Sequence, residues 1–326
     1  MTDVLHIDTL RTEFRIAGHW RPAIDGISLH VAHGETLALV GESGCGKSIT
    51  ALSIMGLVPD PGGRIASGSI KLEGNELVGL REEQLEKYRG DRMAMIFQEP
   101  MTSLNPVMTI GDQVAESLIL HRNLSKSAAR ARALEVLEEV KIPSAASRFD
   151  DYPHQFSGGM RQRVMIAIAL ACEPALLLAD EPTTALDVTI QAQVLGLLAD
   201  LKAKHGMAML FITHNLGVVA QIADRVAVMY AGQIVEQGQV QAIFAAPAHP
   251  YTRALFAAIP RMDIDGQDLA AIRGRVPALD AMPAGCRFAP RCLLKRAGCE
   301  APQSLAPTGP DHLARCHVAT GVHAHA

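Results

Sequence analysis

Two hydrophobic patterns divide the chain. Residues 4–33 alternate apolar and polar positions, which predicts strands of an antiparallel sheet with one solvated face. The stretch GSIKLEGNEL, around Gly74-Asn75, predicts a hairpin that continues this sheet. Short apolar runs predict a different kind of strand, buried on both faces in a parallel sheet. These runs are residues 35–40, 93–98, 175–180 and 207–213.

A helical pattern occupies the segment between two of these runs. Within it, Ala128–Val140 places Leu134, Leu137 and Val140 at helical spacing, which predicts an amphipathic helix. We therefore predict an α/β fold with a helical subdomain at about residues 99–160. The alternative is a packing appendage without a role of its own.

Composition limits the classes of function. The 326 residues carry 30 basic and 34 acidic side chains with no long block of like charge, which argues against a nucleic-acid partner. The N-terminus lacks the basic-then-apolar layout of a signal peptide. The longest stretch free of Asp, Glu, Lys and Arg, His205–Ala223, contains a polar turn and predicts a strand and a helix start rather than a membrane span. We expect any membrane attachment to come through a partner.

A phosphate-binding loop follows the first buried strand. GESGCGKS, residues 41–48, fits G-x-x-x-x-G-K-[ST] and precedes the helix-like stretch ITALSIMGL. In this motif backbone N–H groups and a helix N-terminus surround phosphate oxygens, the lysine reaches the β- and γ-phosphates, and the hydroxyl ligates Mg²⁺. The pattern predicts an ATP and Mg²⁺ site. Its residues are Gly41, Ser43, Gly44, Cys45, Gly46, Lys47, Ser48 and Ile49.

A carboxylate pair supplies the metal side of this site. ALLLADE, residues 175–181, predicts a buried strand that places Asp180 at its C-terminal end, where open α/β sheets bind ligands. We predict that Asp180 holds Mg²⁺ through water and that Glu181 polarises the attacking water, as general base or as electrostatic anchor. Alone, such a pair could equally be a solvated strand end; the loop at residues 41–48 in the same chain favours the functional interpretation.

Residues 156–162, FSGGMRQ, connect these motifs to a known family. They resemble the LSGGQ signature of ABC-transporter nucleotide-binding domains, with Phe for Leu and Met for Gln, two substitutions that resemble the peptide-importer branch. At a helix start, Ser157 and the amides of Gly158 and Gly159 would make a second anion site. The resemblance implies that this site, with Gln162, faces the γ-phosphate bound by a second ATPase subunit.

The same resemblance assigns further residues in the family's order. Gln98 resembles the Q-loop glutamine that senses Mg²⁺ and the water, Ala185-Leu186-Asp187 the D-loop, and His214 the switch histidine at the γ-phosphate. Phe14 is the candidate aromatic that stacks on adenine, with Trp20 as a substitute. The implied fold has a RecA-like parallel core, an antiparallel β subdomain and a helical subdomain within residues 1–240.

A C-terminal extension, residues 241–326, follows. HPYTRALFAAIP, residues 249–260, resembles the segment that opens the extension of dipeptide, oligopeptide and nickel importer ATPases. The Gly-, Pro- and Asp-rich residues 261–285 predict an extended linker. A cysteine cluster then appears with the spacing C-x5-C-x6-C-x16-C. Its members are Cys286, Cys292, Cys299 and Cys316.

Four clustered thiolates can ligate Zn²⁺ or a [4Fe–4S] cube. The wide spacings and the resemblance to importer tails favour the iron–sulfur cluster over zinc. Reduced structural cysteines or a partial disulfide staple remain the alternative without metal. Whichever ion binds, we expect it to stabilise a tail that has little apolar content for a core.

The resemblance as a whole implies an importer ATPase at the cytoplasmic face of the inner membrane. Its partners would be a second ATPase subunit, two transmembrane permease subunits and an extracytoplasmic solute-binding protein. Peptides are the expected cargo, with nickel complexes, glutathione and other small polar solutes left open. A soluble ABC protein acting on ribosomes or DNA is the alternative; the single P-loop, the single signature and the tail argue against it. A purely regulatory nucleotide switch is a further alternative, which the complete set of hydrolytic residues disfavours.

Overall fold

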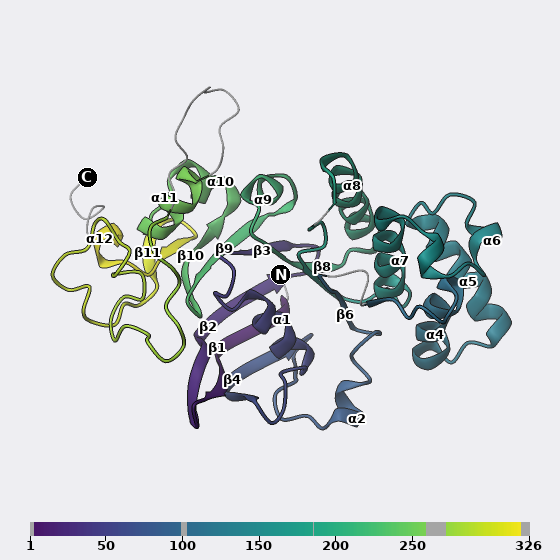
Figure 1. Cartoon of the computed structure of the whole chain (residues 1–326), viewed down its shortest axis with the longest axis horizontal. Coiled ribbons are helices and arrows are strands. Elements are labelled where there is room, and N and C mark those ends of the chain that lie inside the picture. The colour runs from purple at the N-terminus through teal and green to yellow at the C-terminus, as the bar shows by residue number, and fades with distance from the viewer. Residues whose placement is uncertain (1–2, 99–102, 185, 259–271, 321–326) are drawn as a thin grey trace. The chain divides into compact units, whose positions relative to one another are not determined.

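The computed structural model of the chain describes residues 3–98, 103–184, 186–258 and 272–320. Figure 1 shows the helices and strands of the chain. They fall into two compact units built from several segments each. The first contains residues 1–4, 31–35 and 79–211, and the second residues 5–30, 36–78 and 212–326. Each unit is described by itself.

The first unit combines parallel strands with helices. Strand β6 (Met93–Ile96) pairs in parallel with β7 (Leu176–Asp180), and β8 (Ala208–Thr213) adjoins β7 and continues into the second unit. The side chains of β7 and β8 are buried throughout, as the uninterrupted apolar runs predict. The helices are α2 (Glu82–Leu85), α4 (Ile110–Arg122), α5 (Lys126–Glu139), α6 (Ala145–Arg148), η1 (Pro153–Gln155), α7 (Gly158–Leu170) and α8 (Val188–His205).

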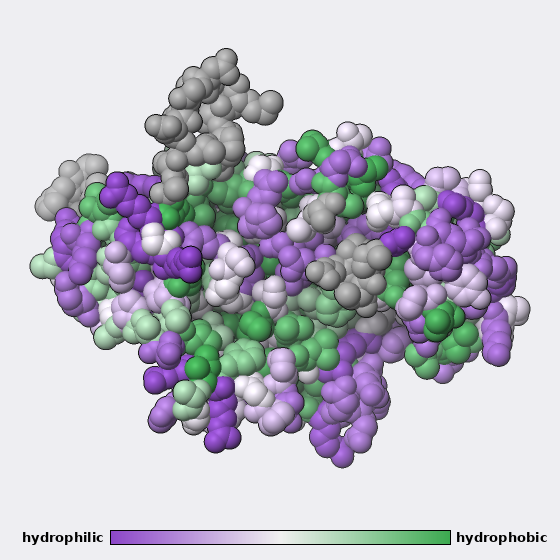
Figure 2. Space-filling view, in the orientation of Figure 1, coloured by the Kyte–Doolittle hydropathy of each residue, from purple (hydrophilic) through white to green (hydrophobic). Residues whose placement is uncertain are grey.

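Helix α5 confirms the predicted amphipathic helix. It begins after Ser125, whose hydroxyl accepts a hydrogen bond from the Ala128 N–H at 3.3 Å. Leu137 and Val140 are buried, and Leu134 is half-buried. Side chains over α5 and α6 are mostly hydrophilic on the face shown in Figure 2, as expected for helices that bury one side.

The second unit contains an antiparallel sheet with the strand order β2-β1-β4-β5. Its strands are β1 (Asp3–Ile16), β2 (His19–Ala32), β4 (Gly63–Leu72) and β5 (Asn75–Glu76). Strand β1 pairs with β4 from Leu5↔Leu72 to Phe14↔Gly63. Both predictions for this region, the alternating strands of residues 4–33 and the hairpin around Gly74, are confirmed.

The second unit also carries a run of strands in the order β11-β12-β10-β9-β3. Strands β3 (Thr36–Val40) and β9 (Arg225–Tyr230) are parallel, and β9, β10 (Gln233–Gln239), β12 (His312–Ala314) and β11 (Ala306–Gly309) are antiparallel neighbours. The predicted parallel set lacked β9. The helices of this unit are α1 (Lys47–Met55), α9 (Leu216–Ile222), α10 (Val240–Ala245), α11 (Pro250–Ala257) and α12 (His317–Thr320).

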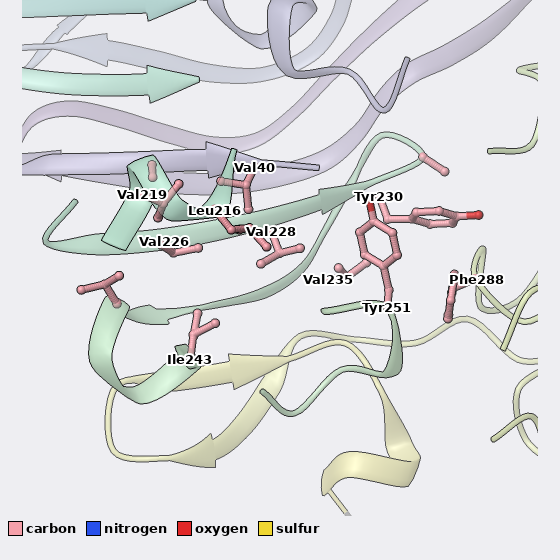
Figure 3. Close-up of a cluster of buried hydrophobic side chains, with 13 residues drawn as sticks. Val40, Leu216, Val219, Val226, Val228, Tyr230, Val235, Ile243, Tyr251 and Phe288 are labelled. Atoms are coloured by element: carbon pink, nitrogen blue, oxygen red, sulfur yellow. The ribbon is translucent and has the colours of Figure 1, made fainter. Parts of the chain in front are cut away.

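One buried cluster joins the tail to this sheet (Figure 3). Tyr230 at the end of β9, Tyr251 on α11 and Phe288 pack with ring centroids 4.6–5.3 Å apart, and each side chain is at most 3% exposed. Residues 272–285 form neither helix nor strand, in agreement with the predicted linker, whose residues 261–271 lie outside the described chain.

Candidate functional site

The P-loop lies between β3 and α1. Gly46 has φ +114°, and a Cβ there would lie 2.7 Å from the Met229 side chain and 3.1 Å from the Ala23 carbonyl, so the position requires glycine. Helix α1 begins at Lys47, and its N-terminus therefore faces the loop. Strand, loop and helix follow one another as predicted.

The loop's side chains divide by exposure. Lys47 is 6% exposed, and its Nζ donates to the carbonyls of Gly41 at 2.9 Å and Glu42 at 3.1 Å. Cys45 is buried, which raises the pKa of its thiol. Of the other predicted loop residues, Gly41 is buried, Ser43, Gly44 and Ser48 are exposed, and Gly46 and Ile49 are half-buried.

A glutamine and a glutamate meet in the first unit. The Gln98 Nε2 donates to the Glu181 Oε2 at 3.0 Å, and the Thr184 hydroxyl donates to the same oxygen at 2.9 Å. Glu181 has φ +47°, an unusual conformation for a residue other than glycine. Asp180, at the end of β7, is 5% exposed. The structure thus brings together Gln98 and Glu181, which lie 83 positions apart; sequence reasoning did not find Thr184.

The signature segment forms the start of α7. Ser157 is its N-cap and is exposed, as is Gly158. A Cβ at Gly159 would lie 2.8 Å from the Ile190 side chain, which favours glycine there. Gln162 is only 2% exposed, so its side chain is turned into the unit.

The remaining predicted residues have local structural roles as well. Asp187 caps α8 by accepting from the Ile190 N–H at 2.9 Å, and Ala185 of the same motif lies outside the described chain. His214 follows β8 and is exposed. Phe14 is half-buried, and the guanidinium of Arg64 lies 4.2 Å over the ring of its predicted substitute, Trp20.

The four tail cysteines line a common pocket, together with His249 and His317. All six cysteines of the chain are free. Burial raises the pKa values of the Cys286 and Cys292 thiols, and negative charge on the neighbouring Cys299 and Cys316 would raise them further. The Nε2 of His317 is buried at this pocket without a hydrogen-bond partner among the described residues.

The predicted metal site is not formed in this arrangement. Among the residues that the structure describes, no group of three or more His, Cys, Asp or Glu side chains could hold a metal ion. A zinc ion needs all its sulfur ligands about 2.3 Å from one point. The partial disulfide staple is not formed either, since the thiols are free.

Comparison with known proteins decides the family. Residues 24–184 match the ABC transporter family, and residues 235–299 match the oligopeptide/dipeptide transporter C-terminal region. The chain belongs to the ATP-binding proteins of ABC transporters. It is 56% identical to the oligopeptide transport ATP-binding protein AppD of Bacillus subtilis, over 90% of this chain and 89% of that one. It is 49% identical to the dipeptide transport ATP-binding protein DppD of the same organism, over 92% and 90%.

Solved ABC cassettes share the fold. A dimeric structure of the bacterial ABC transporter cassette MJ0796 matches with a TM-score of 0.64 and 27% identity, over 72% of this chain and 98% of that one. CbiO1 of Clostridium perfringens, part of the transporter complex cbiONQ, matches with a TM-score of 0.64 and 25% identity, over 75% and 92%. The protein is therefore an ABC-type ATPase, an enzyme that hydrolyses ATP. Within the described residues, no helix is long and apolar enough to cross a membrane.

Proposed function

We propose that this ABC ATPase powers the import of di- or oligopeptides through a binding-protein-dependent transporter. The observation that carries the proposal is the combination, in one chain, of an ABC cassette with the oligopeptide/dipeptide C-terminal region. Relatives that match about nine-tenths of the chain are named for oligopeptide and dipeptide transport. The alternative of a soluble protein acting on ribosomes or DNA lacks comparable support.

The P-loop binds the phosphates of ATP in this proposal. Lys47 leaves the carbonyls of Gly41 and Glu42 for the β- and γ-phosphates, which gives its charge a stronger partner. The exposed backbone of Ser43 and Gly44 and the N-terminus of α1 surround the phosphates. Phe14 stacks on the adenine.

The donor set fits Mg²⁺. Ser48 offers a hydroxyl, Asp180 a carboxylate and Gln98 an amide oxygen, and magnesium prefers oxygen ligands of this kind. When bound, the ion neutralises charge that develops on the phosphates. These residues would hold it together with oxygens of the nucleotide.

Glu181 acts on the attacking water. Gln98 and Thr184 both donate to its Oε2, which fixes the side chain that polarises the water, as general base or as electrostatic anchor. His214 contacts the γ-phosphate from the end of β8. Positioning of the water and stabilisation of charge provide the rate enhancement.

A second ATPase subunit completes each nucleotide site. The start of α7, with Ser157 and Gly158 exposed and Gly159 half-buried, would face the γ-phosphate held by that subunit. Gln162 and Asp187 would act by fixing the local backbone, because one is buried and the other caps α8. The ATPase pair would dock on two permease subunits at the cytoplasmic face of the inner membrane.

The transport proposal is tested by reconstituting the chain with candidate permease and partner ATPase subunits in vesicles. We expect ATP hydrolysis to rise several-fold when the solute-binding protein and a peptide are added. The proposal fails if peptide and binding protein leave hydrolysis unchanged while ribosomes or DNA stimulate it. A nickel complex that stimulates where peptides do not would refute the cargo alone.

We also propose that the tail cysteines hold a [4Fe–4S] cluster. The common pocket of the four thiols and the unpartnered Nε2 of His317 support this, as does the ligand chemistry of four cysteines. The four cysteines would hold the cluster, which would stabilise the fold of the tail. The thiols must lose protons on binding, and the raised pKa values of Cys286 and Cys292 oppose this loss.

The test is anaerobic purification of the whole chain with assay of iron, sulfide and zinc. About four irons and four sulfides per chain, with broad visible absorption, are expected. About one zinc without iron, or no metal at all, would refute the cluster and leave the ATPase assignment intact.

A further inference from the structure

The segment CRFAPRC, residues 286–292, joins the cysteine pocket to the P-loop. Its two terminal cysteines line the pocket. Three of the side chains between them contact the nucleotide-binding part of the same unit. Arg287, Phe288 and Arg291 make these contacts, and each side chain is at most 8% exposed.

Arg291 contacts the P-loop directly. It forms a bidentate ion pair with Glu42, with NH1 2.8 Å from Oε2 and NH2 3.1 Å from Oε1. The Arg291 side chain is 6% exposed and that of Glu42 25%. Its Nε donates to the Arg273 carbonyl at 2.8 Å, so the guanidinium is fixed in its plane. A bidentate pair in this setting restrains orientation as well as distance.

Glu42 is held at three points. Its carboxylate is held by Arg291, its N–H donates to the Tyr251 hydroxyl at 2.8 Å, and its carbonyl accepts from Lys47 at 3.1 Å. Glu42 directly follows the first glycine of the P-loop. The position of the phosphate-binding lysine is therefore linked to two residues of the C-terminal extension.

A second set of contacts runs in parallel. Arg287 donates to the Ala231 carbonyl and pairs with Asp25. Gly232, which follows Ala231 in the chain, donates its N–H to the Cys45 carbonyl in the P-loop at 2.8 Å. Both arginines of the segment thus lie next to a pocket cysteine and act on the loop, one directly and one through the turn between β9 and β10.

We propose that the CRFAPRC segment positions the P-loop for nucleotide, with Arg291 as the positioning residue, and that an intact cysteine pocket is needed to hold it there. The proposal rests on the ATP site described above and on neither the cargo nor the occupant of the pocket. Arg291 does not contact the reacting atoms; it acts through Glu42. Loss of the pair therefore affects ATP affinity more than turnover at saturating ATP.

The test uses the full chain and compares Arg291→Ala and Arg291→Lys with Arg296→Ala. Arg296 is exposed in the same tail, and its replacement removes the same charge. We expect Arg291→Ala to raise the Kd for MgATP about tenfold, or about 1.4 kcal/mol, with kcat within twofold of wild type. Arg291→Lys should recover part of the affinity, and Arg296→Ala should resemble wild type.

Hydrogen exchange and a double-mutant cycle separate positioning from general destabilisation. Without nucleotide, the amides of residues 41–48 should exchange faster in Arg291→Ala, while those of β7 are unchanged. Glu42→Gln should reproduce the loss of affinity, and the double variant should be no worse than either single one. If Arg291→Ala does not fold, Glu42→Gln carries the same test from the loop side.

The pocket is tested with Cys292→Ser. It should accelerate exchange of residues 41–48 and weaken ATP binding in the wild-type background, and add nothing in Arg291→Ala. Unchanged affinity in Arg291→Ala, or additive losses with Glu42→Gln, would refute the positioning role. An effect of Cys292→Ser that adds to that of Arg291→Ala would refute the link to the pocket. Lys47→Ala distinguishes failure of the positioning proposal from failure of the proposed ATP site. Unchanged ATP binding in Lys47→Ala would refute the ATP site itself.

Discussion

Phe288→Ala should destabilise the whole second unit rather than the tail alone. Phe288 is 3% exposed and packs against Tyr230 at 5.2 Å and Tyr251 at 5.3 Å between ring centroids. Tyr230 ends β9, a strand that pairs with the P-loop strand β3. Removing the ring therefore opens a cavity beneath the nucleotide-binding sheet.

The expected loss is about 3–5 kcal/mol, the range for truncating a buried phenylalanine to alanine. The edge-on contact with Tyr230 accounts for about 0.5–1.5 kcal/mol of it. Domains of this kind are stable by about 5–15 kcal/mol in total. A fifth or more of the free energy of unfolding would thus be lost, and the urea midpoint should fall clearly.

The single tryptophan provides the assay. Trp20 lies in β2 of the second unit, outside the tail, so its fluorescence reports unfolding of the nucleotide-binding part. The control is Leu293→Ala, which truncates a side chain that is 88% exposed and should cost less than about 0.5 kcal/mol. If the Trp20 transition of Phe288→Ala coincides with wild type, the tail folds independently and the reasoning is wrong.

Three further changes test the site and the packing. Glu181→Gln should retain ATP binding, slow hydrolysis at least about 100-fold and accumulate an ATP-bound dimer in light scattering. Glu13→Gln should lower the unfolding temperature at pH 7, because the hydrogen bond from Arg64, aided by Arg11, holds the pKa of Glu13 low. The stability that the Glu13 carboxylate contributes is present above pH about 4.3. It is lost as the pH falls through the lowered pKa. Gly111→Ala should cost about 1–3 kcal/mol or more, because its Cβ would lie 2.1 Å from the Phe149 ring.

Each of these has a contrary outcome. Unchanged turnover in the Gln variant of Glu181 would remove it from the hydrolytic step. A stability difference between Glu13→Gln and wild type that does not shrink as the pH is lowered would show that the carboxylate's charge is not its source. Gly196→Ala is the control for Gly111, since nothing lies within 4 Å of its Cβ and it should stabilise α8 by up to about 1 kcal/mol. Equal effects at both glycines would contradict the steric argument.

Local patterns predicted the parts of the fold that local forces determine. The buried runs of β3, β7 and β8 were recognisable because strands covered on both faces are continuously apolar. The P-loop was recognisable because its function fixes residue types at a fixed spacing. Strand β9, RVAVMY, was equally apolar, but no motif followed it to draw attention to it.

Contacts between residues that are distant in the sequence could not be predicted from local patterns. Glu42 and Arg291 are 249 positions apart, and nothing in either local sequence indicates the other. The two arginines between the pocket cysteines were visible in the sequence. Only the fold, which places them against the P-loop and the neighbouring turn, indicates a role for them. The cysteines were predicted to cluster, and the structure gives them a common pocket without an assembled metal site.

The pairing of β12 with β10 has a consequence for how the protein is made. Gly238 and Gln237 of β10 pair with His312 and Leu313 of β12. Strand β10 is therefore synthesised well before the strand with which it pairs. A nascent chain that has released β10 but not β12 presents an unsatisfied strand edge to its surroundings. Premature termination or slow translation within this interval would therefore expose newly made molecules to edge-to-edge aggregation.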